Sequence, residues 1–255
     1  ASDVYKRQAW LLTIGPTAGV DPESFIHSKF IVVWACNSVS TNLHHWHIIK
    51  EAQKKGAKVV VIDSYASRTA KEADWHVCPK PGTDGALAMA MMNVIIEENL
   101  VDQDYVDNYT VGFKELAEKA KERTPEWAEG ITGISAEDIR QLAREYATTQ
   151  PSAIRIGVAL EKSWGGSQAI RAVTALPALT GAWRHVGGGI LQFPVWEHPY
   201  KFDVICRPDL IPKGTQVVNN LQLGRVLTGE QKLNVPIKSM MCWNTCLLYT
   251  SDAAD

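Results

Sequence analysis

Two short apolar runs, one helix length apart, constrain the fold more than any other feature. Phe30–Trp34 reads FIVVW and Lys58–Ile62 reads KVVVI, with Gly56 just before the second run. Continuous runs rich in β-branched residues and bounded by polar residues are typical of strands buried on both faces of a parallel sheet. A strand, a helix and a second strand make a βαβ unit. We therefore expect an α/β fold with a parallel, Rossmann-like sheet.

The two ends of the chain are unusual. Residues 1–8 and 246–255 can be back-translated into nucleotide strings that are reverse complements over most of their length, as a sequencing adapter read in frame would be. We expect both ends to be non-native translation and exclude them from the fold. On this interpretation the natural part runs from about residue 9 to 245 and is an internal piece of a longer protein.

The charge balance argues against nucleic acid as a partner. The whole chain has a formal net charge of −2, and removing residues 1–8 and 246–255 leaves −1. Proteins that bind nucleic acid usually present a strongly basic face. No apolar run reaches the length of a membrane-spanning helix, so we also expect no membrane span in this chain.

Metal-ligand patterns are weak. Cys36, Cys78, Cys206 and Cys242 form no CxxC pair, so neither a zinc site nor a local iron–sulfur motif is predicted. Histidines stand at 44, 45 and 47 in the predicted helix. Residues so close together on a helix point in different directions, which favours surface or packing roles over a metal cluster.

Polar residues follow each of three predicted strands. Asn37 follows the first and Asp63 the second, while Pro81-Gly82-Thr83-Asp84 follows a third strand expected at Asp74–Val77. In open parallel sheets, ligands bind beyond the carboxyl ends of the strands. The sequence therefore predicts a binding site at this edge of the sheet.

Both polar loops can be interpreted in two ways. Asn37 and the hydroxyls of Ser38, Ser40 and Thr41 precede a helix, where free N–H groups and the helix dipole suit a phosphate, but the same residues are ordinary helix caps. Asp63 could accept hydrogen bonds from a ribose or a base, or close a turn. The segment has no GxGxxG, so the usual NAD fingerprint is missing.

The chain beyond Asp84 predicts helices and then a return to strand. An apolar helix is expected from Gly85 to Leu100, and Ser135 begins another in a capping-box pattern. A new strand is expected from Ala153, after Pro151. We predict a Rossmann-like domain over residues 9–148 and part of a second α/β domain over residues 149–245.

An ordered set of motifs carries a family resemblance. The set comprises Trp34-x-x-Asn37, GAKVVVID at 56–63, TA-x-x-AD at 69–74, PGTDGAL at 81–87, GVALEK at 157–162, GG at 165–166, LPALTG at 176–181, GGG at 187–189 and PIK at 236–238. Its order and spacing resemble the molybdopterin oxidoreductases of the dimethyl sulfoxide reductase superfamily. The resemblance covers nearly all of residues 9–245.

The resemblance implies a molybdenum or tungsten cofactor carried by two molybdopterin guanine dinucleotides. It implies cofactor-binding roles for four segments, namely Trp34, Cys36, Asn37, Ser40 and Thr41 along the phosphates of one dinucleotide, Asp63 and Ser64 at its nucleoside, Gly82, Thr83 and Asp84 at its guanine, and Gly157 and Glu161 near the second pterin. The guanine assignment is chemically apt, because one carboxylate can accept both the N1–H and the N2–H2 of guanine.

The sequence departs from the family pattern in its loops. Ala35 and Ser38 stand where relatives often have Gly and Pro, Ser64 replaces a frequent Pro, and Glu161 often corresponds to Gln or Arg. The resemblance places the protein ligand of the metal and any iron–sulfur cysteines upstream of Trp10. We therefore expect cofactor-binding residues in this chain, but neither a metal ligand nor a catalytic residue.

The function implied is transfer of an oxygen atom or a hydride equivalent to or from a small-molecule substrate, with iron–sulfur and membrane-anchor subunits as possible partners. The resemblance is compatible with the periplasmic or membrane-associated side of a prokaryote, and the location stays open. Two alternatives remain: a non-catalytic scaffold relative in an electron-transfer complex, and a plain nucleotide-binding α/β domain.

Overall fold

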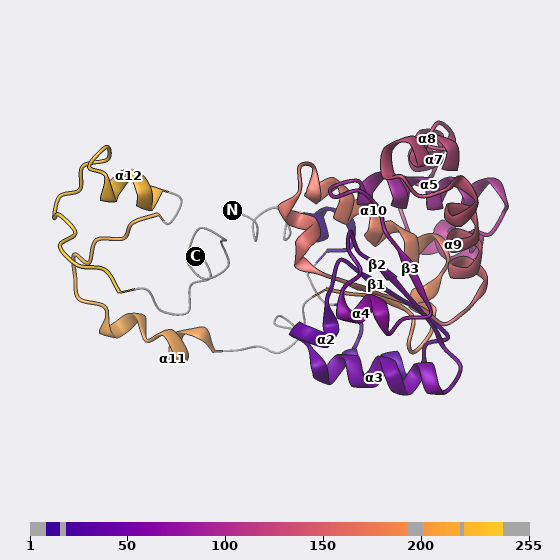
Figure 1. Ribbon diagram of the computed structural model, residues 1–255, viewed down its shortest axis with the longest axis horizontal. Helices are drawn as coiled ribbons and strands as arrows, with labels where there is room; N and C mark the ends of the chain where they lie inside the picture. The colour runs from indigo at the N-terminus through magenta and orange to yellow at the C-terminus, as the bar shows by residue number, and fades with distance from the viewer. Residues whose placement is uncertain (1–8, 16–18, 193–200, 220–221, 242–255) are drawn as a thin grey trace. The chain divides into compact units, whose positions relative to one another are not determined.

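The computed structural model describes residues 9–15, 19–192, 201–219 and 222–241 (Figure 1). The chain divides into two compact units, Ala1–Pro199 and Tyr200–Asp255. The strands of the described chain all lie in the first unit, so this unit carries the predicted α/β fold.

A single parallel sheet forms the centre of the first unit. Its strand order is β3-β2-β1-β4-β5, and each neighbouring pair is parallel. The strands are β1 (Phe30–Trp34), β2 (Lys58–Ile62), β3 (Trp75–Val77), β4 (Ser152–Ile156) and β5 (Gly189–Leu191). The predicted bounds of the first two strands are confirmed, and the third is one residue shorter than expected. The strand order reverses between β1 and β4, which is where open α/β sheets bind ligands.

The expected division at residues 148/149 does not separate two compact units. β4 pairs with β1 along its whole length, from Phe30 opposite Ser152 to Trp34 opposite Ile156, and β5 pairs with β4. A strand buried beside the central strand satisfies its N–H and C=O groups only within that sheet. Residues 149–191 therefore complete the first sheet instead of beginning a second.

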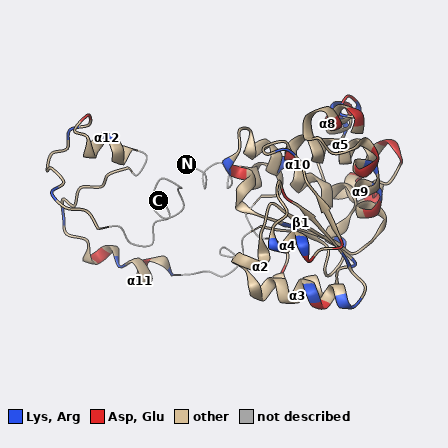
Figure 2. Ribbon diagram, in the orientation of Figure 1, with Lys and Arg blue, Asp and Glu red and all other residues tan. Residues whose placement is uncertain are grey.

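Helices cover both faces of the sheet, giving three layers (Figure 1). On one side lie α5, α8, α9 and α10, and on the other α3 and α4. The helices of the first unit are η1 (Pro22–His27), α2 (Ser38–Thr41), α3 (Leu43–Lys54), α4 (Arg68–Lys71), α5 (Asp84–Glu97), α6 (Gln103–Tyr109), α7 (Phe113–Lys121), α8 (Pro125–Thr132), α9 (Ala136–Thr148), η2 (Val158–Lys162), α10 (Gly166–Leu179) and η3 (Ala182–Arg184). Such layering buries both faces of a parallel sheet, as continuous apolar strands require. The outer helices α3 and α9 each carry both basic and acidic residues (Figure 2).

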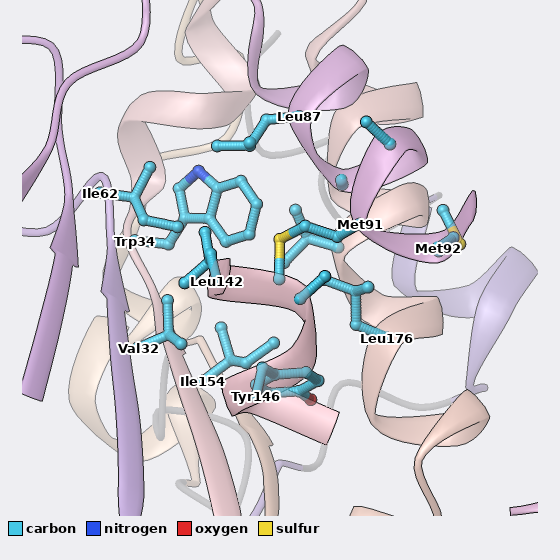
Figure 3. Close-up of a cluster of buried hydrophobic side chains, with 14 of the residues drawn as sticks. Val32, Trp34, Ile62, Leu87, Met91, Met92, Leu142, Tyr146, Ile154 and Leu176 are labelled. Carbon is cyan, nitrogen blue, oxygen red and sulfur yellow. The ribbon is translucent and has the colours of Figure 1, made fainter. Parts of the chain in front are cut away.

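The core splits into two clusters because successive side chains of a strand point to opposite faces. Val32 and Trp34 of β1 face α5 and α9 in the larger cluster (Figure 3). Ile31 and Val33 face α3 in the smaller one. Leu87, Met91, Val94 and Ile95 of α5 are buried, which confirms the apolar face predicted for that helix.

Helix starts follow the capping chemistry that the sequence indicates. Asp21 accepts a hydrogen bond from the N–H of Glu23 and begins η1, which is a 3₁₀ helix with Pro22 as its first residue. Ser135 Oγ accepts from the N–H of Asp138 at the start of α9. Each cap satisfies a backbone donor that the helix itself leaves unpaired.

The second unit contains only short helices in its described part: α11 (Phe202–Cys206), η5 (Pro208–Leu210) and α12 (Leu223–Leu227). None of these three helices has a buried residue. Residues 201–219 and 222–241 form no strand, and a second α/β domain stays a prediction. None of the helices in the described ranges combines the length and hydropathy needed to cross a membrane.

Candidate nucleotide-binding cleft

A cleft of about 530 Å³ opens at the carboxyl ends of β1, β2 and β3. Asp63, Ser64, Gly82 and Asp84 line it, together with Ala35. The parallel sheet places the ends of neighbouring strands at one edge, and this brings together residues far apart in sequence, such as Asp63 and Asp84. These four predicted site residues therefore do lie in one cavity.

Asp84 is the more enclosed of the two acids. It is the first residue of α5, and its Oδ1 accepts a hydrogen bond of 2.8 Å from the indole Nε1–H of Trp34. Burial raises the pKa of Asp84, and the Trp34 hydrogen bond opposes that rise. A half-buried carboxyl at a helix N-terminus is well suited to accept hydrogen bonds from a ligand.

Asp63 follows β2 and is also half-buried. Burial raises its pKa, the N–H groups of Ser64 and Tyr65 lower it, and the nearby Asp84 raises it further. The imidazole of His76 hydrogen-bonds the main-chain oxygen of Asp63 at 2.9 Å and fixes the turn. Two carboxyl groups that interact electrostatically in one cleft form a site for a ligand with several hydrogen-bond donors.

The loop after β1 is tied down by side-chain hydrogen bonds. Asn37 Oδ1 accepts from Thr69 Oγ1 at 2.8 Å, and Asn37 Nδ2 donates to Tyr65 Oη at 3.3 Å. The N–H of Val39 donates to Thr69 Oγ1. Asn37 occupies the N-cap position of α2, but its side chain makes no capping bond there. Ser40 and Thr41 are exposed beyond it. Of this loop, Ala35 lines the cleft, whereas Asn37, Ser40 and Thr41 do not.

Four predicted site residues are buried away from the cleft lining. Trp34 is fully enclosed in the core, and Cys36 is buried with its Sγ 3.4 Å from Ser38 Oγ. Glu161 is buried in η2 while its neighbours Leu160 and Lys162 line the cleft. Gly157 packs against the backbone of Ala35. A cofactor contact for these four stays a prediction.

Gly157 brings the ends of β4 and β1 into direct contact. Its N–H donates to Trp34 O at 2.7 Å, and a Cβ at this position would lie 1.7 Å from Ala35 O. A glycine is therefore needed here for a close backbone approach, as expected. The backbone that approaches Gly157 is that of the loop after β1, at Ala35 and Cys36. Ala35 itself has φ +50°, a left-handed conformation that glycine adopts without strain.

Sequence reasoning missed several residues of the cleft, including two lysines and a tryptophan. Lys80 and Lys162 add positive charge to the lining, and Trp164 stands at its rim, fully exposed. Lys80 stands in no motif, and Lys162 ends the GVALEK motif without a predicted role, because η2 approaches the β3 loop only in the folded chain. Trp164 is held by a hydrogen-bonded turn in which Ser163 Oγ donates to Leu160 O.

Two other hollows have no carboxylate among the described residues of their lining. One of about 670 Å³ contains the predicted site residue Thr83 together with Lys119 and Arg171. A larger hollow of about 780 Å³ is lined by described residues without a charged side chain, including Tyr105, Phe113 and Trp183. His45 is buried, whereas His44 and His47 are exposed, so the three histidines do point apart. In the described ranges, no three His, Cys, Asp or Glu side chains come together as a set that could hold a metal ion.

Residues 13–249 match the family model described as molybdopterin oxidoreductase. The chain belongs to the molybdopterin oxidoreductase family. It is 42% identical over 239 residues to a probable oxidoreductase, YoaE, of Bacillus subtilis (strain 168), covering 93% of this chain and 35% of that protein. It is 30% identical over 270 residues to the dimethyl sulfoxide reductase DmsA of Escherichia coli (strain K12), covering 90% and 33%.

A solved structure agrees with these sequence matches. Acetylene hydratase from Pelobacter acetylenicus aligns with a TM-score of 0.67 at 32% identity, covering 74% of this chain and 25% of that chain. The resemblance to the dimethyl sulfoxide reductase superfamily and the α/β fold are thereby confirmed. Membership of a molybdopterin family supports a molybdenum–pterin cofactor. The chain spans about a third of the length of the two curated relatives.

Proposed function

We propose that this chain belongs to the catalytic subunit of a molybdenum or tungsten oxidoreductase and that its cleft holds the nucleoside of one molybdopterin guanine dinucleotide. The observation that carries the proposal is the pairing of Asp63 and Asp84 in one cleft at the carboxyl edge of the sheet. The family match supports the cofactor class.

The donor and acceptor sets fit a guanine nucleotide. Guanine offers N1–H and N2–H2 side by side, and the ionised carboxylate of Asp84 can accept both. Asp63 follows the neighbouring strand, where an acid accepts hydrogen bonds from a ribose. The cleft volume of about 530 Å³ lies within the usual range of small-molecule sites, about 300–1,000 Å³.

Positive charge for the phosphates comes from Lys80 and Lys162 in this proposal. Both line the cleft with the two acids, so cationic and anionic groups share one cavity. Ser40 and Thr41 of the Asn37 loop are exposed but do not line the cleft, and a phosphate contact for their hydroxyls is a further part of this proposal. Glu161 lies in η2 and Gly157 directly precedes that helix. In this proposal both residues lie close to the second dinucleotide.

The bound cofactor would supply a metal centre that changes oxidation state while an oxygen atom or a hydride equivalent is transferred. This chain's own residues bind and orient the nucleotide end. Its described residues supply no set of ligands for the metal. A small-molecule substrate, and iron–sulfur and membrane-anchor subunits as partners, belong to the same proposal.

The test is cofactor content. The longer protein that contains this chain is to be purified from a host with intact molybdenum-cofactor synthesis, and its metal and guanine nucleotide measured. We expect both molybdenum or tungsten and guanine nucleotide. A well-folded protein with neither contradicts the proposal and favours the scaffold alternative. Guanine nucleotide without metal would instead indicate a plain nucleotide-binding domain.

A further inference from the structure

Trp34 connects the core to the cleft. It is the last residue of β1, it is fully buried, and its indole Nε1–H donates to Asp84 Oδ1 at 2.8 Å across 50 residues of sequence. A buried indole normally has a hydrogen-bond partner. Here that partner is the carboxylate that lines the cleft, instead of a backbone oxygen inside the core.

The packing around Trp34 fixes the direction of its N–H group. The indole ring lies beside Ile62 and Leu87, with its nitrogen on the side of Leu87 (Figure 3). Leu87 lies three residues after Asp84 on α5, and so on the same side of that helix. Ring and carboxylate are thus held by the same two elements, and neither needs to be ordered when a ligand arrives.

We propose that Trp34 is a positioning residue, which holds the Asp84 carboxylate in the orientation that receives guanine. This inference rests on the proposed function of the cleft. The indole N–H and the backbone N–H of Asp84 itself each occupy one acceptor site of the carboxylate. Since a carboxylate has about four such sites, two stay available for a ligand. A side chain held in this way loses less conformational entropy on binding. The phosphate role that the family resemblance implies for Trp34 stays a separate prediction, and the role proposed for it in this inference is at the base.

Trp46 provides a matched control. It is also buried, and its Nε1–H also donates to a carboxylate, Glu72 Oε2 at 3.2 Å. It belongs to the smaller core cluster, on the other face of the sheet, and Glu72 does not line the cleft. Trp34→Phe and Trp46→Phe therefore remove the same donor and similar volume, but only the first changes Asp84.

The first experiment observes the hydrogen bond in the wild-type chain. The Nε1–H signal of Trp34 in an NMR spectrum should shift as Asp84 titrates, and the Asp84→Asn variant should remove that shift. The Trp46 signal should not follow Asp84. In Trp34→Phe, the pKa of Asp84 should rise, because burial is then opposed only by the backbone hydrogen bond. A Trp34 signal that ignores the titration of Asp84 overturns the inference, even if Trp34→Phe fails to fold.

The second experiment measures GDP affinity. We expect Trp34→Phe to weaken GDP binding roughly tenfold and Trp46→Phe to leave it unchanged. In an Asp84→Asn background, Trp34→Phe should have no further effect, because the positioned carboxylate is gone. Equal losses in both backgrounds would show a structural role and overturn the inference. A wild-type chain that binds no GDP refutes the guanine site itself, and the NMR titration still decides whether Trp34 holds Asp84.

Discussion

Gly157→Ala is the substitution that most sharply tests how the cleft is built. The new methyl carbon would lie 1.7 Å from Ala35 O and 2.5 Å from Ala35 C, whereas real Cβ atoms essentially never approach within 3.0 Å. The obstacle is backbone, so no side-chain rotation relieves it. The ends of β1 and β4 must move apart by more than about 1 Å.

The cost follows from what that movement breaks. The Gly157 N–H···Trp34 O bond of 2.7 Å is lost, and both residues are buried, so both groups are left without water or a partner. An unmade buried hydrogen bond costs about 1–3 kcal/mol, and overpacking costs a similar amount. We therefore expect a loss of about 3–5 kcal/mol, a large fraction of the roughly 5–15 kcal/mol that stabilises a typical domain.

The assay is urea unfolding followed by far-UV circular dichroism, with the free energy of unfolding obtained by linear extrapolation. Gly130→Ala is the matched control, because Gly130 sits inside α8 and an added methyl carbon there would meet nothing within 4 Å. Alanine there should stabilise by about 0.5–1 kcal/mol. A Gly157→Ala chain within about 1 kcal/mol of wild type would refute the reasoning.

Three further substitutions test single features. Ala35→Gly removes the strain of a left-handed backbone at φ +50°, a gain of about 1–2 kcal/mol. The greater conformational entropy of glycine in the unfolded chain offsets part of this gain. The free energy of unfolding in the same urea assay should therefore rise by up to about 1 kcal/mol. Burial, aided by Arg155, lowers the pKa of His45 to about 3, so the folded state keeps it neutral while the unfolded state protonates near pH 6.5. Protonation of His45 in the unfolded state should therefore lower the free energy of unfolding by about 3 kcal/mol between about pH 7 and 4. In His45→Leu the free energy of unfolding should fall less over this pH range. An unchanged slope would contradict the prediction. Burial raises the pKa of Asp63, so the ionised carboxyl destabilises the folded state at neutral pH. Asp63→Asn should therefore raise the urea midpoint at about pH 7 but not at about pH 3, and it should weaken GDP binding. A lower midpoint at neutral pH would contradict the prediction.

The sheet was predictable because its strands carry their own signal. Phe30–Trp34 and Lys58–Ile62 are apolar on both faces, and burial on both faces is what the structure shows. The domain boundary was not predictable, because no local pattern tells which sheet a later strand joins. β4 lies over 100 residues from β1 in sequence, yet pairs with all five of its residues.

The candidate site was predictable to the extent that it lies at strand ends. Asp63 and Asp84 follow strands closely, and both line the cleft. Trp34 also stands at a strand end, but alternation along β1 turns its side chain into the core, with only the N–H reaching Asp84. Lys80 lies outside the motifs and Lys162 has no predicted role within its motif, because the two lysines line one cleft only once η2 packs beside the β3 loop. Position along the chain locates the edge of the sheet, whereas tertiary packing decides which atoms face the ligand.

The central claim is that the cleft beside β1, β2 and β3 is a guanine-nucleotide site. The most direct measurement is an NMR titration of the isotope-labelled chain with GDP, with ADP as comparison. We predict that GDP shifts the backbone amide signals of Ser64, Gly82 and Asp84 and that ADP does so far less. Amide signals at these three positions that do not shift with GDP, or that shift equally with ADP, would contradict the prediction.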